Sequence, residues 1–345
     1  MTAEQRESAP RISVVLPVRN EERHLRETLE ALIEQEFPKR CYEVIVVDGQ
    51  STDATREISA EYARRHPTLV RVFPNPAQIV SAGRNIGVAQ ARGEVIAFVE
   101  GHARVERDFL ATIERDFADS GAQCLARYVD QFFAEDNWVQ RATALARRTF
   151  VGHNPHSGRF GPPTPGMMSP LGVAAVYRRA VLKQAGGYDE RYTTNEDVEL
   201  NWRIERSGGS AYRSGRLIYH LHPRDSLAGL LHQMINYGRG KRRFVGHHRD
   251  ALRLAYVIPT VIVASAALAV PAWLIHPLAG APVALPGAAY LLAAIGAGVS
   301  AARRGLGYLV SVPLALAVIA LGFGIGFALG PGGNPPPEQS HPGGP

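Results

Sequence analysis

Polar side chains that can bind a metal ion or a nucleotide follow four short runs rich in Ile, Val and Phe. In chain order they are Arg19, Asn20 and Glu21; Asp48, Gly49 and Ser51; Asn75; and Glu100, Gly101 and His102. A carboxylate accepts hydrogen bonds from ribose or base donors, and carboxylate and imidazole groups are ligands for divalent cations. These residue types therefore suit a nucleotide whose diphosphate is held by a divalent cation.

The elements that must position these side chains alternate between strands and helices. Ile- and Val-rich runs predict strands, and apolar residues at helical spacing, such as Leu25, Leu29 and Leu32, predict helices between them. The predicted strands cover residues 12–17, 43–48, 70–73 and 95–100, and the predicted helices cover 21–35, 52–65 and 81–91. Four strands with helical crossovers predict a doubly wound, mostly parallel α/β sheet, which binds ligands at the carboxyl ends of its strands.

Motifs and composition argue against several other functions. No G-x-G-x-x-G follows the first predicted strand and no G-x-x-x-x-G-K-[ST] occurs in the chain, which excludes the dehydrogenases and kinases that carry those loops. The first 256 residues contain 36 Lys or Arg and 31 Asp or Glu, without lysine tracts or RNA-type aromatic motifs. We therefore expect no nucleic-acid partner.

The charge distribution separates an apolar tail from the rest of the chain. Three charged side chains occur from Val257 onward, against 67 before it. Apolar stretches cover residues 257–275, 283–300 and 307–329, and each is near the roughly 20 residues that cross a bilayer. Three membrane spans are therefore predicted, although the Gly- and Pro-containing middle stretch is also compatible with a re-entrant or interfacial hairpin.

Basic residues predict the orientation of this tail. Arg and Lys gather in residues 239–253 and again at Arg303 and Arg304, whereas the connection between the first two stretches has neither. The positive-inside rule places both basic segments, and the N-terminal part, on the cytoplasmic side of the cell membrane. Cys41 and Cys124 lack disulfide or zinc spacing, and the polar first 11 residues do not resemble a signal peptide, in agreement with cytoplasmic chemistry.

Two strings resemble the opening of the family 2 glycosyltransferases, which have the GT-A fold: ISVVLPVRNEERHLRETLEALIEQ and YEVIVVDGQSTDATREI. The resemblance continues through residues 75–103, 172–209 and 222–243, in an order similar to that of the succinoglycan-type glucosyltransferases. Those relatives also carry C-terminal membrane helices. The resemblance implies transfer of a sugar from a nucleotide diphosphate to a hydroxyl group, with inversion at the anomeric carbon.

The resemblance implies a donor pocket built largely from the segments after the strands. Its implied donor-binding residues are Pro17, Arg19, Glu21, Asp48, Ser51, Gly83, Arg84, Glu100, Gln233 and Arg239. Asp48 occupies the place of the acid that contacts base or ribose, and Arg84 is available for a phosphate. Two alternatives stay open: Asp48 caps the turn into the next helix, and Gly83 serves helix packing.

Glu100 and His102 occupy the place of the family's D-x-D metal site, and the chain departs from that pattern at both positions. Both residues are competent ligands for Mg²⁺ or Mn²⁺, and the softer imidazole favours Mn²⁺. The resemblance implies a third ligand from His220 or His222, between which the sequence does not choose. The alternative for His102 is an ordinary surface histidine.

Asn195, Glu196 and Asp197 match the family's E-D motif at the start of a predicted helix. The resemblance makes Asp197 the general base for an attacking sugar or lipid hydroxyl, with Glu196 beside it. Acids also complement the helix dipole in a first turn, which explains the same residues without catalysis. The preceding glycine pair, Gly186 and Gly187, predicts a loop that admits the acceptor.

Gln233 and Arg239 lie in a segment similar to the Q-x-x-R-W motif of processive synthases, but the Trp is missing. The resemblance implies that they close over the diphosphate or the acceptor. The alternative is an interfacial helix whose basic end binds anionic headgroups.

The predicted protein has a GT-A domain over residues 11–225, preceded by a flexible segment, 1–10. A basic interfacial segment over 226–256, about three transmembrane helices over 257–330 and a disordered tail over 331–345 follow. We expect a hexosyltransferase that moves a sugar, with UDP-sugar the expected donor, to a lipid-linked or saccharide acceptor at the cytoplasmic membrane face. A polyprenyl-phosphate sugar synthase and a non-catalytic sugar-nucleotide-binding membrane protein are the alternatives.

Overall fold

The computed structural model describes residues 9–131, 137–153, 160, 164–171 and 174–330. The described residues form two compact units. The first contains residues up to Glu190 and the segment Glu196–Asp225, and the second contains Arg191–Asn195 and the residues from Ser226 onward. The predicted disordered tail, and residues 1–8 of the predicted flexible N-terminus, lie outside the described residues.

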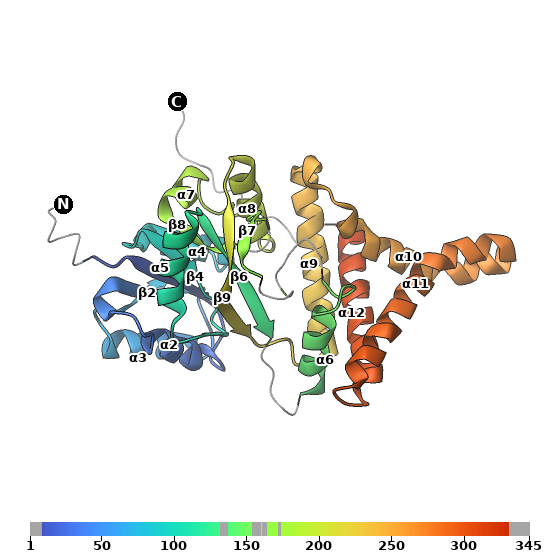
Figure 1. Cartoon of the computed structure of the whole chain (residues 1–345), viewed down its shortest axis with the longest axis horizontal. Helices are drawn as coiled ribbons and strands as arrows, with labels where there is room; N and C mark the ends of the chain where they lie inside the picture. The colour runs from blue at the N-terminus through green and yellow to red at the C-terminus, as the bar shows by residue number, and fades with distance from the viewer. Residues whose placement is uncertain (1–8, 132–136, 154–159, 161–163, 172–173, 331–345) are drawn as a thin grey trace. The chain divides into compact units, whose positions relative to one another are not determined.

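A mixed sheet of nine strands forms the centre of the first unit, counted over the described part of the chain (Figure 1). The strands are β1 (Ile12–Val18), β2 (Tyr42–Asp48), β3 (Val70–Pro74), β4 (Val95–Phe98), β5 (Ala103–Val105), β6 (Cys124–Gln131), β7 (Gly166–Met168), β8 (Ala174–Arg178) and β9 (Ala211–Leu221). Their order is β3-β2-β1-β4-β8-β6-β9-β5, and β7 pairs with β9.

The four predicted strands are β1 to β4, and they are parallel to one another. The antiparallel strand β8 lies between β4 and β6 and makes the sheet mixed. Val18 is paired with Asp48, and Asp48 with Pro74, so β1, β2 and β3 end at the same edge. Polar residues that follow these strands are thereby brought together.

Helices cover both faces of this sheet. They are α2 (Leu25–Ile33), α3 (Thr55–Arg65), α4 (Val80–Gln90), α5 (Phe109–Ser120), α7 (Arg179–Gln184) and α8 (Glu196–Arg206), and a further helix, α6 (Trp138–Arg147), follows β6 in the chain. One buried apolar cluster joins the sheet to α2, α3 and α5, and another joins it to α4, α7 and α8. Val14 belongs to the first cluster and Val15 to the second, because successive side chains of a strand point to opposite faces.

Helix α4 crosses β1 at a glycine. A Cβ atom at Gly87 would lie 2.2 Å from Cγ1 of Val15, so any larger residue would push the helix away from the strand. This close approach fixes α4 against β1, and Arg84 lies about one turn before Gly87, where it lines a pocket at the carboxyl edge of the sheet.

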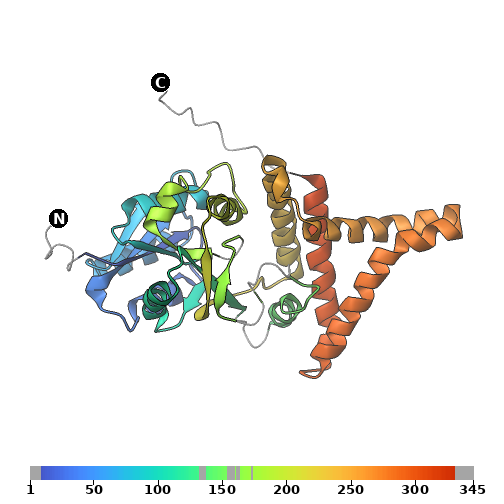
Figure 2. The ribbon, with the colours of Figure 1, turned by 45° about the horizontal axis from the view of Figure 1, so that its top comes forward.

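The second unit consists mainly of long helices: α9 (Leu227–His247), α10 (Leu254–Ile275), α11 (Pro277–Ala302) and α12 (Tyr308–Leu329). Figures 1 and 2 show α9 and α12 side by side. Glycines allow this contact, since Cβ atoms at Gly238 and Gly326 would lie 2.3 and 2.1 Å from carbonyl oxygens of Phe323 and Ile235.

Three helices of the second unit are long and apolar enough to cross a membrane, judged by length and composition: Leu254–Ile275, Gly280–Ala302 and Tyr308–Leu329. The middle segment is a single helix, although Pro282 and Pro286 lie within it. The described residues therefore favour a continuous helix over the predicted alternative of a re-entrant hairpin.

Candidate active site

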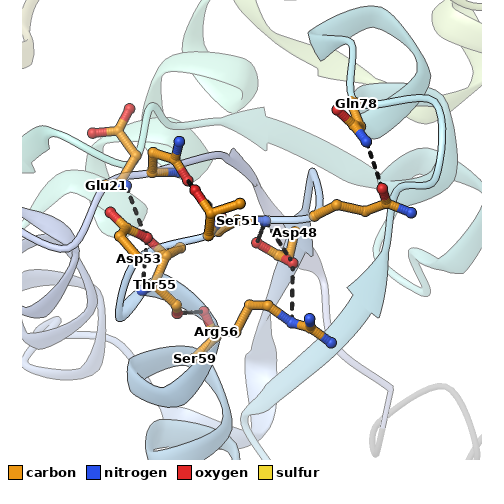
Figure 3. Close-up of polar contacts among 11 residues, drawn as sticks. Glu21, Asp48, Ser51, Asp53, Thr55, Arg56, Ser59 and Gln78 are labelled. Carbon is orange, nitrogen blue, oxygen red and sulfur yellow. Dashed lines mark hydrogen bonds and ion pairs between the residues drawn. The ribbon is translucent and has the colours of Figure 1, made fainter.

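Side-chain hydrogen bonds join the loops that follow β1 and β2 (Figure 3). Oγ of Ser51 accepts a hydrogen bond from the backbone N–H of Asn20 at 3.0 Å, and Oγ1 of Thr55 accepts one from the N–H of Glu21 at 2.7 Å. The predicted donor-binding residue Ser51 thus serves the neighbouring backbone. These contacts fix Glu21 at the carboxyl edge of the sheet.

The Asp48 carboxylate is directed into its own turn, as Figure 3 shows. Its two oxygens accept hydrogen bonds from the backbone N–H of Ser51 at 3.2 and 3.4 Å, and Oδ2 lies 3.7 Å from Nε of Arg56. Asp48 therefore caps the turn into the next helix, which is the predicted alternative to contact with a base or ribose.

A pocket of about 240 Å³ opens at the carboxyl ends of β1 to β4. Of the predicted site residues, those that line it are Pro17, Arg19, Glu21, Arg84, Glu100 and His102. Asp48, Ser51 and Gly83 do not line it. Gly83 lies behind the wall, where a Cβ atom would be 3.1 Å from Nδ2 of Asn75 and 3.3 Å from Cβ of Pro17.

Two buried polar atoms of pocket-lining residues, Oδ1 of Asn75 and Nε of Arg84, have no hydrogen-bond partner. Nδ2 of Asn75 donates to the carbonyl of Ile79 at 2.8 Å, which fixes the orientation of the amide. An unsatisfied buried polar group costs roughly 1–3 kcal/mol. Both residues line the pocket, although these two atoms themselves are buried beneath its surface.

Backbone strain gathers around this edge. Among the non-glycine residues that the structure describes, positive φ occurs at Asn20, Gln50, Gln78 and Asn195, with values of 55° to 61°. The first three follow β1, β2 and β3, and the fourth directly precedes α8. Left-handed conformations of such residues cost on the order of 1–3 kcal/mol and are typical of functional sites. A hydrogen bond of 2.5 Å from Gln78 to Gln50 connects two of these loops (Figure 3).

Two buried arginines neutralise two of the site's acids. Nη1 of Arg84 contacts Oε1 of Glu196 at 2.9 Å, and Nη1 of Arg127 contacts the two carboxylate oxygens of Glu100 at 2.5 and 2.7 Å. Burial raises the pKa of Glu196, and the charge of Arg84 offsets only part of this rise. Breaking a buried pair leaves one charge uncompensated, so these contacts hold α4, α8, β6 and the end of β4 in place.

Asp197 differs from the acid next to it in the chain. It is half-buried, and Oδ1 accepts a hydrogen bond from the N–H of Val198 at 2.8 Å, but no ion pair of its carboxylate occurs among the described residues. Burial alone lowers the pKa of Arg84 and Arg127, yet nearby acids, Asp197 among them, raise it overall. Asp197 thus lies close enough to both arginines for its charge to act on them.

The loop predicted to admit the acceptor is firmly anchored. Gly186 and Gly187 have φ of 77° and 75°, which only glycine adopts without strain. Asn85 accepts a hydrogen bond from the N–H of Tyr188 at 2.8 Å and donates one to its carbonyl at 2.9 Å. The loop therefore holds the Tyr188 ring 5.1 Å from the Arg84 guanidinium.

His102 joins the pocket through Glu21. Its Nδ1 lies 2.9 Å from Oε1 of Glu21. Burial favours the neutral ring, but the hydrogen bond and charge of Glu21 outweigh burial and raise the pKa of His102. Glu21, Glu100 and His102 line one pocket and offer the carboxylate and imidazole groups that bind Mn²⁺, but their ligand atoms are not all within 4.8 Å of one another. The oxygens of Glu100 would be shared with Arg127.

The two histidines proposed as a third ligand lie elsewhere. His220 contacts Oε1 of Glu106 at 2.7 Å and Oδ2 of Asp130 at 3.5 Å. His222 is stacked on His24, with ring centroids 4.3 Å apart. Neither histidine lines the pocket.

Gln233 and Arg239 lie on α9, in the second unit. A pocket of about 290 Å³ there is lined by Thr193, Thr194, Asn236, Arg239, Gly240 and Arg243. Nε of Arg239 is buried without a hydrogen-bond partner, and Gln233 is not among the lining residues. The pocket wall is rich in hydrogen-bond donors and carries two guanidinium groups, which suits an anion.

The segment Arg191–Asn195 is bound along α9. The hydroxyl of Tyr192 lies 2.7 Å from Nδ1 of His247, and Nη1 of Arg243 donates to the carbonyl of Arg191 at 3.2 Å. This segment leads directly into the Glu196–Asp197 pair at the start of α8.

Sequence reasoning gave no role to Arg127 or Asn85. Arg127 interrupts the apolar start of β6, and a buried charge in a strand is itself a signal that a partner exists. Asn85 follows Arg84 in the AGRNIG string, but its partner loop is about 100 residues later in the chain. Its contact could not be read from local spacing.

The sheet order, the pocket at its carboxyl edge and the acid pair at the start of α8 define a glycosyltransferase of the GT-A type. The chain belongs to glycosyl transferase family 2, whose family model matches residues 13–186. The predicted family, fold class and enzyme class are therefore confirmed.

Similarity to known proteins extends beyond the family match. The succinoglycan biosynthesis protein ExoA of Rhizobium meliloti is 29% identical over 251 residues, which cover 72% of this chain and 74% of that protein. A Methanococcus voltae dolichyl N-acetyl-alpha-D-glucosaminyl phosphate 3-beta-D-2,3-diacetamido-2,3-dideoxy-beta-D-glucuronosyltransferase is 24% identical over 236 residues, covering 67% and 72%. The structure of the Pyrobaculum calidifontis mannosyltransferase PcManGT, in complex with GDP-Man and Mn²⁺, shares the fold at a TM-score of 0.56 and 20% identity, over 90% of this chain and 86% of that one.

The Arg84–Glu196 pair provides a test of this site's architecture. Replacing Arg84 by Met leaves the Glu196 carboxylate buried without its cation, which should cost roughly 3–5 kcal/mol of stability. The double variant Arg84→Met, Glu196→Met should recover most of this loss, because no unpaired charge remains. Thermal unfolding of the purified full chain measures both effects. Equal destabilisation of the single and double variants would contradict the assignment.

Proposed function

We propose that this glycosyltransferase transfers a sugar from a nucleoside diphosphate sugar, with UDP-sugar the expected donor, to a hydroxyl of a lipid-linked or saccharide acceptor. The observation that carries the donor assignment is the first unit's pocket, where Oδ1 of Asn75 and Nε of Arg84 lack partners. The complex of PcManGT with GDP-Man and Mn²⁺ supports a nucleotide sugar as the ligand class. The relation to ExoA, a succinoglycan biosynthesis protein, supports a role in polysaccharide or glycolipid assembly.

In this mechanism the pocket residues orient the donor. Asn75 accepts a hydrogen bond from the base or ribose, and Arg84 and Arg19 face the diphosphate. Glu100 and His102, with Glu21 beside them, would hold Mn²⁺ or Mg²⁺, which neutralises the charge that develops on the leaving diphosphate. Arg127 keeps Glu100 in place at the pocket wall.

Asp197 accepts the proton of the attacking hydroxyl. Its carboxylate is half-buried and forms no ion pair within the described part of the chain, whereas the Glu196 carboxylate is held by Arg84. Attack from the side of Asp197, opposite to the leaving diphosphate, inverts the anomeric configuration. Glu196 therefore fixes the start of α8, and Asp197 does the proton transfer.

Replacing Asp197 by Asn should reduce kcat roughly 10²–10⁴-fold while donor binding is kept, because the amide cannot accept the hydroxyl proton. Steady-state transfer assays and titration with the donor measure the two effects. Asp119→Asn, on the exposed side of α5, is the matched control. A loss of only a few fold would favour the polyprenyl-phosphate synthase alternative, since a phosphate acceptor needs no strong base.

The donor cation has a separate test. Treatment with a chelator should lower activity roughly 100-fold or more, and Mn²⁺ should restore it best, because several kcal/mol of charge stabilisation are removed with the ion. Glu100→Ala should resemble chelation, whereas Glu57→Ala on the exposed surface of α3 should not. Full activity in chelator would instead indicate that cationic side chains such as Arg84 stabilise the charge of the leaving diphosphate.

The second unit supplies the proposed acceptor binding. Its three helices of membrane length, together with the basic residues of α9, support anchorage in the cell membrane with the catalytic part in the cytoplasm. The pocket around Arg239 and Arg243 has the chemistry for a phosphate of a lipid-linked acceptor.

Replacing Arg239 and Arg243 by Gln should raise the KM for a polyprenyl diphosphate-linked acceptor roughly 10- to 100-fold, given about 1.5–3 kcal/mol for a hydrogen bond to a charged group. The KM for the nucleotide sugar should stay unchanged. Arg242→Gln is the control, because this exposed neighbour does not line the pocket. A rise in the KM for the nucleotide sugar instead would indicate that Arg239 binds the donor, as the sequence resemblance implied.

A further inference from the structure

A cluster of two histidines and one glutamate lies in the first unit outside the donor pocket. His24 precedes α2, Glu27 is in the first turn of that helix, and His222 follows the end of β9. Each offers one ligand atom, and these atoms all lie within 4.8 Å of one another. Nε2 of His222 is 3.7 Å from Oε2 of Glu27. Ligand atoms of one metal ion at bond lengths near 2.1 Å lie at most about 4.2 Å apart, so small side-chain rotations would bring these three atoms to a shared ion.

The two imidazole rings lie face to face. They are stacked with centroids 4.3 Å apart and an interplanar angle of 20°. A metal ion lies in the plane of each imidazole that binds it, so each ring would turn about its Cβ–Cγ bond to share one ion.

None of these three residues lines the donor pocket, where Glu21, Glu100 and His102 are found. The Glu100 carboxylate is bound by Arg127, and Nδ1 of His102 is bound by Glu21. The cluster therefore has its own ligand set, although His102 is close enough for its charge to act on both His24 and His222.

We propose that His24, Glu27 and His222 bind one transition-metal ion, with Zn²⁺ the best match, at a site distinct from the donor cation. Two imidazole nitrogens and one carboxylate are a ligand set for Zn²⁺, whereas Mg²⁺ prefers oxygen ligands. Three protein ligands leave a coordination position for water. The ion would connect the start of α2 to the end of β9, close to Asp225, where the first unit ends.

The test uses the full chain in detergent, stripped of metal with a chelator and studied without nucleotide sugar. Titration calorimetry with Zn²⁺ should show one site, and Co²⁺ should give visible absorption bands of an imidazole-bound ion. His24→Gln and His222→Gln should each weaken Zn²⁺ binding at least tenfold, since even outer-sphere partners of a metal site contribute about that much. Zn²⁺ should also raise the unfolding temperature of the unmodified chain.

Two controls separate this site from the donor cation. His66→Gln, at the end of α3, and Glu100→Ala should both leave Zn²⁺ binding unchanged. Unfolding temperatures of the metal-free variants, compared with the metal-free parent chain, show whether His24→Gln and His222→Gln are folded. If one of them is not, Glu27→Gln provides the third ligand variant. Binding that is lost in Glu100→Ala, that requires nucleotide sugar, or that survives removal of the two histidines would overturn the proposal, as would no binding at all.

Discussion

The need to neutralise buried acids at the carboxyl edge of the sheet organises the catalytic end of this molecule. Glu100 and Glu196 come from segments about 100 residues apart, and each is met by a buried guanidinium, from Arg127 on β6 and from Arg84 on α4. Two charges within a low-dielectric interior are tolerated only as pairs with good geometry. The two pairs connect α4 to α8, and β6 to the end of β4, at one edge of the sheet. The Asp197 carboxylate, by contrast, has no ion pair among the described residues and accepts a hydrogen bond from the N–H of Val198.

The same edge carries strained loops, and the strain is maintained by hydrogen bonds between loops. Asn20 and Gln50 are left-handed without being glycine, and each belongs to a loop that is bonded to its neighbour. The packed sheet below supplies the stability for this, since the strand residues of β1 and β2 are almost entirely buried. A pocket built from such loops is already shaped before a ligand enters it, which reduces the ordering cost of binding.

The sequence allowed prediction of features that are encoded locally. β1 to β4 and their helices follow from short-range patterning, and the acids at the start of α8 were found because their string is contiguous. β8 and β9 escaped prediction because their neighbours in the sheet, β4 and β6, are far away in the chain. The Arg127–Glu100 contact depends on that strand order, so no spacing rule indicates it. The sequence did not choose between His220 and His222, whereas in the structure β9 ends at Leu221, between them, and their contacts differ.

The chain itself links Glu196 and Asp197 to the helical unit. The boundary between the two units falls between Asn195 and Glu196, so these two acids begin a helix whose preceding residues are bound to α9. Nδ2 of Asn195 donates to the carbonyl of Tyr237 at 3.3 Å, and a Cβ atom at Gly240 would lie 2.2 Å from Oγ1 of Thr194, so this segment has little room to shift. Asn195 also has a positive φ, which makes the turn into α8 sharp and costly to change. At this boundary a hydrogen-bonded, left-handed residue of the second unit is joined directly to the first residue of α8, so the backbone that enters this helix is fixed by the contacts of the preceding segment.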